Sequence, residues 1–512
     1  MCAEYMGGSV EMLDRFNGRA APGELAIRGF ANMGAIVAVL LLLFCGQAWA
    51  TTNYVSPTGT AAWVDCEVTA TPCSIATAQT SGGAGDIIIL MDGTYTTGIN
   101  TANNGTSGAG VITWQAQNNR RAILNGLASG ATDKVILVDN AYHIFDGIVI
   151  NVQTGPGAAN TYGLFVSAAT YTEFKNGEIT FTGDEATMGT GNIAYCAQIR
   201  SVTVFTGNYV HNCTYGLSIF SSSASFVPTV NNNTFENMIV GDYEDSDCVA
   251  VSGAASYDWV GLVLEDNECS GYRDDGFDMS SQDNVVIQDN IIHGPINDVA
   301  ENSSCIKAGY EGSNGTKIYR NFCYDIASTA TNRNYGIVMT GASSALAVGN
   351  IFVGGYVGVD ISQRNASGGA DNVVRNNVFS GFSRYGTQIY TGATGTILQN
   401  NVFDGAVYDI LVASGLTATG YTNRMVNALN SIVGTYNQTG DTTGAPGFRS
   451  ASNDSDSASD FRLAAGSTLR RLGTDLNLGN IQDHGNRAFM HPPSCGAWEA
   501  ASGDAATTRT AR

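Results

Sequence analysis

Residues 286–294 read VIQDNIIHG, and the same pattern returns as KIYRNFCYD at 317–325, AVGNIFVGG at 347–355, VVRNNVFSG at 373–381 and ILQNNVFDG at 397–405. In each segment an apolar residue is followed by two variable residues, an Asn, a variable residue and a second apolar residue. The aligned Asn residues lie 23 to 34 residues apart, at Asn208, Asn233, Asn267, Asn290, Asn321, Asn350, Asn377 and Asn401. Such a period, with connections of variable length, is typical of a solenoid built from stacked coils.

The repeat is too short for helices to connect its strands, so we expect β-coils stacked in parallel. An Asn at a turn can then hydrogen-bond its copies in the coils above and below, which satisfies amides that would be costly to bury alone. Two positions after each Asn, a mostly apolar column is expected to point inward, at Val210, Phe235, Cys269, Ile292, Cys323, Phe352, Phe379 and Phe403.

A second set of strands follows the Asn segments, for example DCVAVS at 247–252, GFDMS at 276–280 and SCIKAG at 304–309. Side chains alternate between the two faces of a strand. Alternation points one set of apolar residues inward, namely Val249, Val251, Phe277, Met279, Ile306, Ala308, Ile337 and Met339. The residues between them face outward on successive coils, at Ala250, Asp278, Lys307 and Val338.

The chain is therefore predicted to be all-β, a right-handed parallel β-helix over residues 51–440 with a short N-terminal capping helix near residues 74–80. Residues 441–499 are expected to form a C-terminal closing segment, and residues 500–512 a disordered tail. The 62 Gly residues and the low share of charged residues, 13%, agree with a fold that has many turns and few long helices.

Residues 1–50 are predicted to be a signal peptide. The apolar run at 35–44 is short for a membrane span, and it precedes Ala48-Trp49-Ala50, a small-x-small cleavage site. The mature protein is expected to be secreted or periplasmic, monomeric and free of membrane contact. A formal net charge of −21 excludes nucleic acid as a partner, because binding to a phosphate backbone needs clustered Lys and Arg.

Nine of the eleven cysteines follow the predicted signal, so at least one of them is unpaired within a monomer. An exported chain can oxidise its cysteines. Cys66 and Cys73 bracket a short loop, DCEVTATPCS at 65–74, and are the expected disulfide.

The other cysteines are expected to be harder to connect. Cys269 and Cys323 fall in the inward apolar column with Ile292 between them, so we expect buried free thiols there. Cys248 and Cys305 share an outward column but lie two coils apart. That separation, about 10 Å from the strand spacing, is too large for a disulfide.

Acidic side chains gather in the segment YRDDGFD at 272–278. Asp275 is in register with Asp247 of the preceding coil, and Asp274 and Asp278 lie beside it. Four carboxylates in a patch about two coils high repel one another, and a bound cation relieves that repulsion. Because oxygen ligands with flexible spacing favour Ca²⁺ over zinc or copper, we predict a calcium site at these four residues. The alternative is an ordinary Asp-rich turn.

Lys307 is the one basic residue of its outward column and stacks one coil beyond Asp278. A nearby cation would lower the pKa of this lysine, so that its neutral amine could take a proton near neutral pH. Uronic-acid polymers undergo the matching reaction: a base removes the C5 proton, and the C4–O4 bond breaks by β-elimination. The plainer alternative is a solvated surface lysine.

At these residues the chain resembles the calcium-dependent pectate lyases of polysaccharide lyase family nine. The matching segments are DCVAV at 247–251, DDGFD at 274–278 and SSCIKAG at 303–309. The resemblance implies that Asp247, Asp274, Asp275 and Asp278 bind calcium, that Lys307 is the catalytic base, and that the partner is an acidic polysaccharide. Cys248 and Val249 stand where that family tends to have Gly and Phe.

Other functions on this fold remain open. A glycoside hydrolase could use Asp274 and Asp275 as acid and base, although the Gly-His-Gly and Arg-x-Lys motifs of polygalacturonases are missing. A Lys/Arg pair like that of alginate and chondroitin lyases could form from Lys307 and Arg333, which makes Arg333 the predicted substrate-binding residue. A non-catalytic surface protein, an adhesin or a glycan-binding module, is the alternative from another class.

Overall fold

The computed structural model describes one compact unit within residues 50–512. It covers residues 51–498 with gaps at 154–159, 168–170, 183–192, 202, 221–226, 241–244, 253–260, 281, 297–301, 310–312, 327–332, 364–368, 426–433, 449–456, 465–466, 471, 474–481 and 485–492. The predicted signal peptide and the predicted disordered tail lie outside these residues. Among the described residues, no helix is both long enough and apolar enough to cross a membrane.

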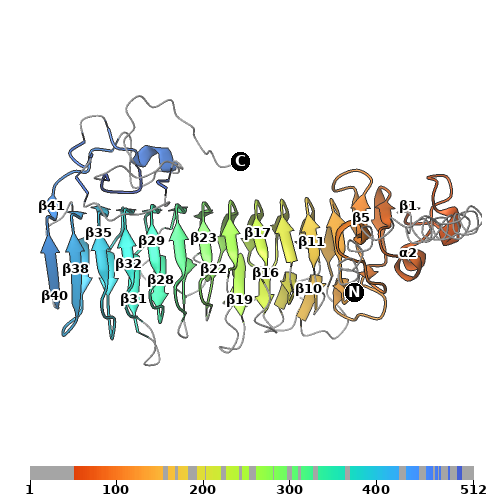
Figure 1. Ribbon diagram of the computed structural model, residues 1–512, viewed down its shortest axis with the longest axis horizontal. Helices are drawn as coiled ribbons and strands as arrows, with labels where there is room; N and C mark the ends of the chain where they lie inside the picture. The colour runs from red at the N-terminus through yellow and green to blue at the C-terminus, as the bar shows by residue number, and fades with distance from the viewer. Residues whose placement is uncertain are drawn as a thin grey trace, which may run out of the picture. The chain divides into compact units, whose positions relative to one another are not determined.

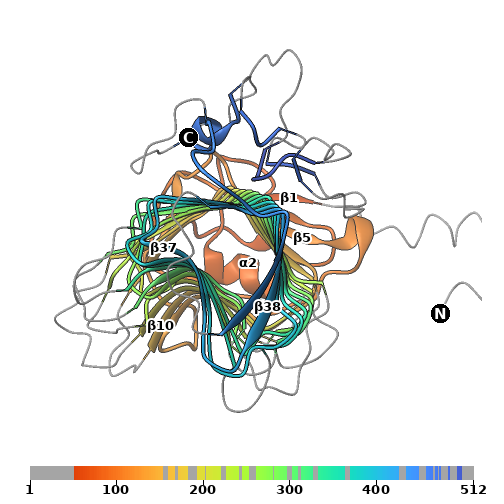
Figure 2. The same ribbon diagram turned by 90° about the vertical axis from the view of Figure 1, so that its left-hand side faces the viewer.

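The chain winds through three parallel sheets, and successive strands enter sheets A, B and C in turn (Figures 1 and 2). Sheet A has 15 strands, β1 (Thr52–Val55), β2 (Ile87–Leu90), β5 (Ile112–Ala116), β8 (His143–Asp146), β11 (Thr172–Lys175), β14 (Thr203–Thr206), β17 (Thr229–Asn231), β20 (Val263–Glu265), β23 (Val286–Gln288), β26 (Lys317–Tyr319), β29 (Leu346–Val348), β32 (Val373–Arg375), β35 (Ile397–Gln399), β38 (Thr417–Tyr421) and β40 (Thr435–Thr439). Sheet B has 14 strands, β3 (Gly93–Tyr95), β6 (Ala122–Leu124), β9 (Val149–Val152), β12 (Glu178–Phe181), β15 (Tyr209–His211), β18 (Thr234–Met238), β21 (Glu268–Tyr272), β24 (Ile291–His293), β27 (Phe322–Tyr324), β30 (Ile351–Val353), β33 (Val378–Ser380), β36 (Val402–Asp404), β39 (Arg424–Met425) and β41 (Thr442–Thr443). Sheet C has 12 strands, β4 (Ile99–Asn100), β7 (Lys134–Val138), β10 (Asn160–Val166), β13 (Ile193–Ile199), β16 (Tyr215–Phe220), β19 (Val249–Ser252), β22 (Asp275–Asp278), β25 (Ser304–Lys307), β28 (Tyr335–Thr340), β31 (Val357–Ser362), β34 (Tyr385–Ile389) and β37 (Tyr408–Val412). The predicted right-handed parallel β-helix is confirmed.

Short helices lie outside the three sheets. The capping helix predicted near residues 74–80 is α2 (Ile75–Ser81), and the Ser74 hydroxyl caps it by accepting a hydrogen bond from the Thr77 amide. Ile75 and Ala78 of α2 belong to the same buried core as the first coils, so this helix covers the N-terminal end of the interior. The described residues also include three single turns of 3-10 helix, η1 (Trp63–Asp65), η2 (Gly108–Gly110) and η4 (Ala458–Phe461).

The predicted Asn column is buried at the corner between sheets A and B, and we call it the Asn ladder. Its members are Asn208, Asn233, Asn267, Asn290, Asn321, Asn350, Asn377 and Asn401, continued by Asn423. In a representative rung, Asn350 Nδ2 donates to Asn377 Oδ1 at 2.9 Å and to the Ile318 carbonyl at 2.9 Å. The Asn350 backbone amide also donates to Asn377 Oδ1, at 2.9 Å. Each side-chain amide is thus satisfied by the neighbouring coils, as predicted.

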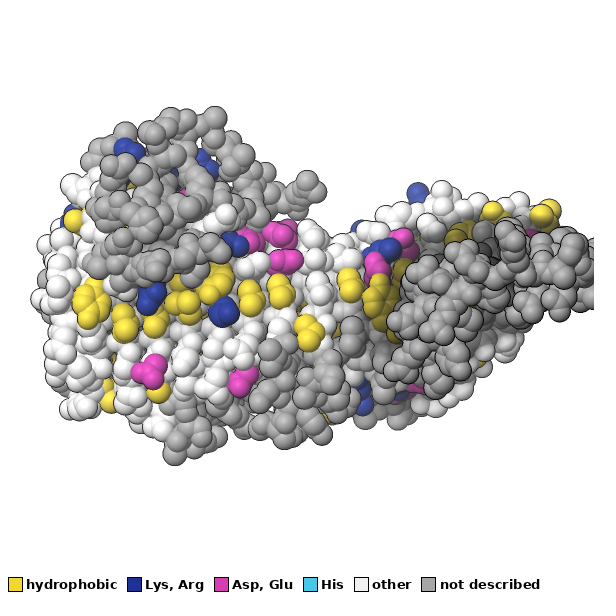
Figure 3. All heavy atoms as spheres, viewed as in Figure 1, with side chains coloured by type: hydrophobic (Ala, Val, Ile, Leu, Met, Phe, Trp, Pro, Cys, Tyr) yellow, Lys and Arg dark blue, Asp and Glu magenta, His cyan; other side chains and the backbone are white. Residues whose placement is uncertain are grey.

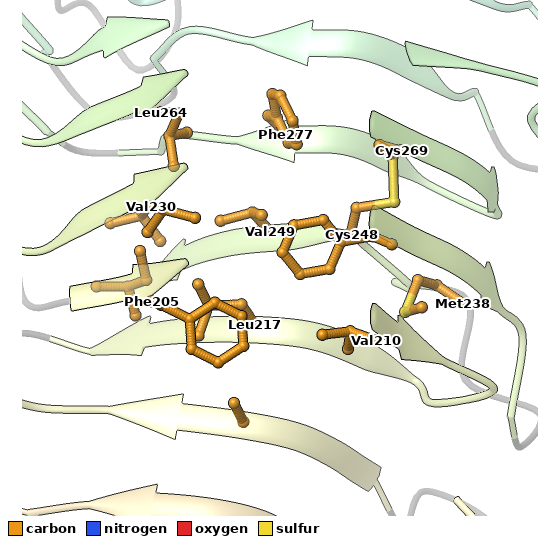
Figure 4. Close-up of a cluster of buried hydrophobic side chains, with 14 of the residues drawn as sticks. Phe205, Val210, Leu217, Val230, Met238, Cys248, Val249, Leu264, Cys269 and Phe277 are labelled. Atoms are coloured by element: carbon orange, nitrogen blue, oxygen red, sulfur yellow. A yellow bond between two sulfur atoms is a disulfide. The ribbon is translucent and has the colours of Figure 1, made fainter. Parts of the chain in front are cut away.

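The interior is a continuous column of apolar side chains from all three sheets. Figure 4 shows Phe205 and Leu264 of sheet A facing Val249 and Phe277 of sheet C across this core. The inward columns expected from the sequence are fully buried, which confirms the predicted register. Of the outward residues on sheet C, Asp278, Lys307 and Val338 are partly exposed, whereas Ala250 is buried.

Three disulfides occur among the described residues. Cys66 and Cys73, the pair expected from the sequence, are bonded. Cys196 is joined to Cys213, and Cys248 to Cys269 (Figure 4).

Two of the sequence predictions about cysteine are wrong. Cys269 is bonded to Cys248 and is not a free thiol, and Cys248 is buried rather than outward. The reason is that this position lies at the corner where each coil enters sheet C, and strict alternation does not apply there. Cys305 is buried as well.

The C-terminal segment packs on the outer face of sheet B. Phe461, Leu469 and Trp498 form a second apolar cluster with side chains of β27, β30, β33 and β36, including Ile351 and Val378. Sheet A instead leaves a row of partly exposed apolar side chains on its outer face (Figure 3), made of Val263, Val286, Leu346, Val373 and Ile397. Sheet C presents a different, polar face.

Candidate functional site

Two columns of side chains run side by side along the outer face of sheet C. The first, which we call the wall column, contains Tyr162, Tyr195, Tyr215, Asp247, Asp275, Ser304 and Tyr335 on successive coils. The second, which we call the floor column, contains Phe165, Gln198, Ser218, Ala250, Asp278, Lys307 and Val338. Parallel pairing keeps the strands about 4.8 Å apart, so residues of one column are direct neighbours.

The Asp cluster, defined as Asp247, Asp274, Asp275 and Asp278, lies where these columns turn acidic. One carboxylate oxygen from each of Asp247, Asp274 and Asp275 lies within 4.8 Å of the other two. Asp247 and Asp275 are nearly fully buried, and Asp247 Oδ1 accepts a hydrogen bond from the Asp275 amide at 2.9 Å. The register that brings them together is the one expected from the sequence.

Lys307 reaches into this cluster from the next coil. Its Nζ lies 2.8 Å from Asp275 Oδ2, 3.0 Å from Asp278 Oδ2 and 3.9 Å from Asp274 Oδ2. Asp278 is turned toward Lys307, and its other oxygen accepts hydrogen bonds from the amide and hydroxyl of Ser280. Asp278 therefore stands apart from the tight group of three carboxylates.

Ser304 fixes the orientation of Asp275. Its amide, at 3.1 Å, and its hydroxyl both donate to Asp275 Oδ1. With Oδ1 held in this way, Oδ2 of Asp275 points to Lys307. The wall column thus positions the carboxylate that contacts the lysine.

The electrostatics of the cluster are unbalanced. Burial and the neighbouring carboxylates raise the pKa of Asp247, and burial with the charge of Asp275 raises the pKa of Asp274 to about 9. Burial also raises the pKa of Asp275, against the opposing effect of Lys307. Buried carboxyl groups that resist ionisation because of one another favour a bound cation.

The pKa of Lys307, on the residues alone, is set by burial and by the carboxylates that it contacts. Burial lowers it, but the charges of Asp275, Asp278 and Asp274 together raise it above its usual value. The expected lowering requires a cation whose charge outweighs these carboxylates. On the residues alone, Lys307 is held as an ammonium.

The donor set fits calcium. Asp247, Asp274 and Asp275 offer converging carboxylate oxygens, and no cysteine or histidine joins the group of ligand atoms found among the described residues. Hard oxygen ligands of this kind suit Ca²⁺ better than transition metals.

Arg333 lies at the corner preceding β28, one coil beyond Lys307. Tyr335 of that strand pairs with Ser304, which sets Arg333 on the C-terminal side of the Asp cluster. Arg333 is exposed, and its guanidinium carbon lies 5.2 Å from the centre of the Tyr356 ring. The structure shows no contact between Arg333 and the cluster among the described residues.

A hollow of about 420 Å³ opens beside the cluster toward earlier coils. It is lined by Asp247, Asp274, Asp278 and Lys307, and also by Tyr195, Tyr215, Ser218, Asp245 and Ser280, which the sequence-based site omitted. A signal for the tyrosines is present in the sequence: Tyr-Gly or Tyr-Cys at 162–163, 195–196 and 215–216 stands in the same frame as Asp-Cys at 247–248 and Asp-Gly at 275–276.

A family model described as a right handed beta helix region matches residues 225–425. Among curated proteins, no sequence matches the chain. Among solved structures the chain is similar to pectate lyase Pel9A, at 18% identity and a TM-score of 0.42, with 89% of this chain and 98% of that chain covered.

The chain is also similar to the PL6 family alginate lyase AlyGC, at 12% identity and a TM-score of 0.50, with 77% of this chain and 56% of that chain covered. A GH136 lacto-N-biosidase from Eubacterium ramulus is similar at 12% identity and a TM-score of 0.43, with 77% of this chain and 68% of that chain covered. At 12% identity and a TM-score of 0.50, the similarity to AlyGC shows a shared fold alone, and the fold of this chain is the right-handed parallel β-helix.

Proposed function

We propose that the protein is a secreted polysaccharide lyase that cleaves an acidic, uronic-acid-containing polysaccharide such as pectate by calcium-assisted β-elimination. The observation that carries the proposal is the position of Lys307. Its Nζ contacts Asp275 and Asp278 and borders the hollow of about 420 Å³. The three disulfides agree with export, because disulfides persist in oxidising compartments.

Each residue of the site has a separate role in this proposal. Asp247, Asp274 and Asp275 would hold a calcium ion with Asp278 at its edge, beside Lys307. The ion when bound would draw charge from the C6 carboxylate of the sugar and acidify its C5 proton. Lys307 takes that proton, and the electron pair left on C5 forms the C4–C5 double bond as the C4–O4 bond breaks. Arg333, which lies on the C-terminal side of the Asp cluster, binds a carboxylate of another sugar in the same polysaccharide.

Lys307 can act as a base only when its amine is neutral. The carboxylates around it raise its pKa, so neutralising those charges removes the cause of the shift. Burial then favours the uncharged amine. Ser304 keeps Asp275 in place through both states, because its hydrogen bonds use the oxygen that does not contact Lys307.

The test is to mix the purified protein with polygalacturonate and Ca²⁺ and to follow the absorbance of the unsaturated product. We expect product with calcium and none after chelation. Alginate and a neutral polysaccharide serve as parallel substrates. Binding of a uronan without any product would replace the lyase by the glycan-binding alternative, and a saturated, hydrolysed product would indicate a glycoside hydrolase.

A further inference from the structure

Beside the Asp cluster, the floor column forms a trough with small side chains at its base. Ser218 and Ala250 occupy the two coils before Asp278, between Lys307 at one end and Gln198 at the other. The hollow of about 420 Å³ covers the part of this stretch from Lys307 to Ser218, and Gln198 lies one coil beyond its lining. Four strand spacings separate Gln198 from Lys307, so the trough is about 19 Å long.

Stacked tyrosines border the trough on the side of the wall column. The ring centres of Tyr162 and Tyr195 lie 5.0 Å apart and those of Tyr195 and Tyr215 lie 5.2 Å apart, with interplanar angles of 7° and 11°. Because the rings stack on one another, their edges and hydroxyls, rather than their faces, border the trough. Tyrosine hydroxyls both donate and accept hydrogen bonds, which suits the hydroxyl groups of a sugar chain.

At the end of the trough farthest from Lys307, a hydrogen-bond acceptor and two aromatic rings hold the side chain of Arg200. Arg200 donates from Nη2 and Nε to Gln198 Oε1, at 2.8 and 3.2 Å. Its guanidinium carbon lies 4.9 Å from the ring centres of both Phe165 and Phe220. Within the described part of the chain, no carboxylate forms an ion pair with Arg200, although the protein is strongly acidic. A guanidinium fixed in this way favours an external carboxylate.

We propose that the trough is a binding subsite for a uronate chain that runs along the helix from the Asp cluster to Arg200, where the guanidinium binds the carboxylate of a distal sugar. The position of the cleaved bond rests on the proposed function, but the binding of the uronate chain in the trough does not. In the other direction the floor column continues through Val338 to Asp360, on the side where the proposed function places Arg333. The subsite is the part of the trough on the N-terminal side of Lys307.

The test compares galacturonate trimers and hexamers, because only the longer chain reaches Arg200. Arg200→Gln should raise the KM for the hexamer roughly 10- to 100-fold and leave kcat and the trimer KM unchanged. Arg384→Gln is the matched control, since Arg384 is exposed on the other side of Lys307 along sheet C and stacks on Tyr385 at 5.3 Å. Equal hexamer KM values for wild type and Arg200→Gln would overturn the subsite.

Binding separates the subsite from the lyase activity. Calorimetry with galacturonate hexamer on a Lys307→Ala background should show weaker binding when Arg200→Gln is added, whether or not the wild type cleaves. Cellohexaose of equal length, which has no carboxylates, should show no dependence on Arg200. Cleavage of both chain lengths without any effect of Arg200→Gln would keep the lyase and remove the subsite.

An independent inference comes from the corner where each coil enters sheet C. One position there faces the inward column of sheet B on the next coil. Where this position is Gly, an added Cβ would lie 2.7 Å from Phe235, at Gly216, and 2.6 Å from Ile292, at Gly276. At Gly216 and Gly276 a side chain would therefore clash with the large residue that it faces.

Cys248 and Cys269 occupy one such pair of facing positions and form a disulfide. Cys305 and Cys323 occupy the same two positions two coils further on. Both are fully buried free thiols in the structure, and burial together with the neighbouring Cys305 thiol raises the pKa of Cys323. We infer that Cys305 and Cys323 form a disulfide in the oxidised protein, which would brace β25 next to Lys307.

The reaction joins two thiols by one S–S bond, and the two electrons and two protons pass to a protein disulfide, which is reduced to two thiols. The purified wild type would be denatured with iodoacetamide and without reductant, digested, and analysed by mass spectrometry. We expect a linked Cys305–Cys323 peptide pair and an alkylated Cys495. Alkylated Cys305 and Cys323 would overturn the inference.

A double variant provides a second test, in which a folded protein should lack the linked peptide. Cys305→Gly combined with Cys323→Ile copies the pair formed by Gly276 and Ile292 one coil earlier. It should fold with an unchanged circular dichroism spectrum and lack the linked peptide. The disulfide between Cys248 and Cys269 must remain detectable in the same digest as the internal control.

Discussion

The Asn ladder and the Asp cluster are both stacks of polar side chains on adjacent coils, yet only the ladder is balanced. In the ladder, each amide donates through Nδ2 and accepts through Oδ1, as in the bonds of Asn350 to Asn377 and Ile318. In the cluster, Asp247 and Asp275 only accept when ionised, and like charges face each other. Lys307 supplies one positive charge to four carboxylates.

The difference separates a structural stack from a chemical one. A neutral, self-complementary column can repeat along the whole helix, because each rung satisfies the next. A column of carboxylates cannot repeat, and it gains from a cation from outside the chain. The ladder therefore holds the coils in register, while the cluster is the place where this register can support binding and catalysis.

The largest effect is expected at Lys307. If it is the base, Lys307→Ala should lower turnover roughly 10²- to 10⁴-fold, and Lys307→Arg should be nearly as damaging because a guanidinium stays protonated. Turnover is measured from the unsaturated product, and calcium binding should persist. Lys317→Ala, on the exposed face of sheet A, is the control. Full activity of Lys307→Arg would assign the base to another residue.

Calcium should stabilise the folded protein through the Asp cluster and should not act through the Asn ladder. At a hundredfold excess over its Kd, calcium should stabilise the folded protein by about 2.7 kcal/mol. Without calcium, stability should fall as the pH rises, because Asp274 has its pKa raised from 3.8 to about 9 and the folded protein keeps a proton that the unfolded chain releases.

Melting temperatures between about pH 5 and pH 9, with calcium and with chelator, measure both effects. Asp274→Asn should flatten the pH dependence and abolish the calcium effect. Asp92→Asn, at an exposed carboxylate far along the chain, should do neither. A calcium effect that survives Asp274→Asn would place the ion elsewhere.

The sequence was sufficient for the ladder and for the columns of sheet C, because both are periodic. Asn350 and Asn377 recur with the coil, and alternation correctly set Asp278 and Lys307 outward. Periodicity fails at corners, where no alternation applies. For that reason the inward position of Cys248 was missed.

Charge effects were harder to predict than positions. The sequence indicated that Lys307 lies beside the Asp cluster, but the sign of its pKa shift depends on which oxygens it contacts. The structure sets Nζ against Asp275 and Asp278, and their charges raise that pKa. The tyrosines of the wall column were not predicted as site residues, because their proximity to the cluster follows only from the register.

Removing one rung should weaken the ladder by an intermediate amount. Asn350→Ala removes the side-chain donor to the Ile318 carbonyl and the oxygen that accepts from the amide and Nδ2 of Asn321, so we expect a loss of about 1–3 kcal/mol in the free energy of unfolding. Denaturant unfolding measures it, with Asn437→Ala, at an exposed position of β40, as the control. Equal stabilities of the two variants would show that the ladder contributes nothing beyond solvation.

The smallest effect is expected at Asp441, a carboxylate at the C-terminal end of the Asn ladder. This carboxylate ends the ladder: Oδ1 accepts from the Asn423 amide at 2.7 Å, and Oδ2 accepts from the Tyr436 hydroxyl at 2.8 Å. A terminal rung has no next coil to donate to, so a group that only accepts is suited to it. Burial raises the pKa of Asp441, because the ionised carboxylate is less well solvated there than in water.

Asp441→Asn keeps one acceptor oxygen for Asn423 and sets an amide against Tyr436, whose hydroxyl can accept as well as donate. The exchange trades a charge-assisted hydrogen bond for a neutral one and removes the burial of a charge. These changes oppose each other, so we expect the free energy of unfolding to change by less than about 1 kcal/mol. Denaturant unfolding measures the free energy of unfolding of this variant, and the same measurement on Asp274→Asn gives the corresponding value for the Asp cluster. A loss larger than that of Asn350→Ala would mean that the charge itself, and not the pattern of acceptors, closes the ladder.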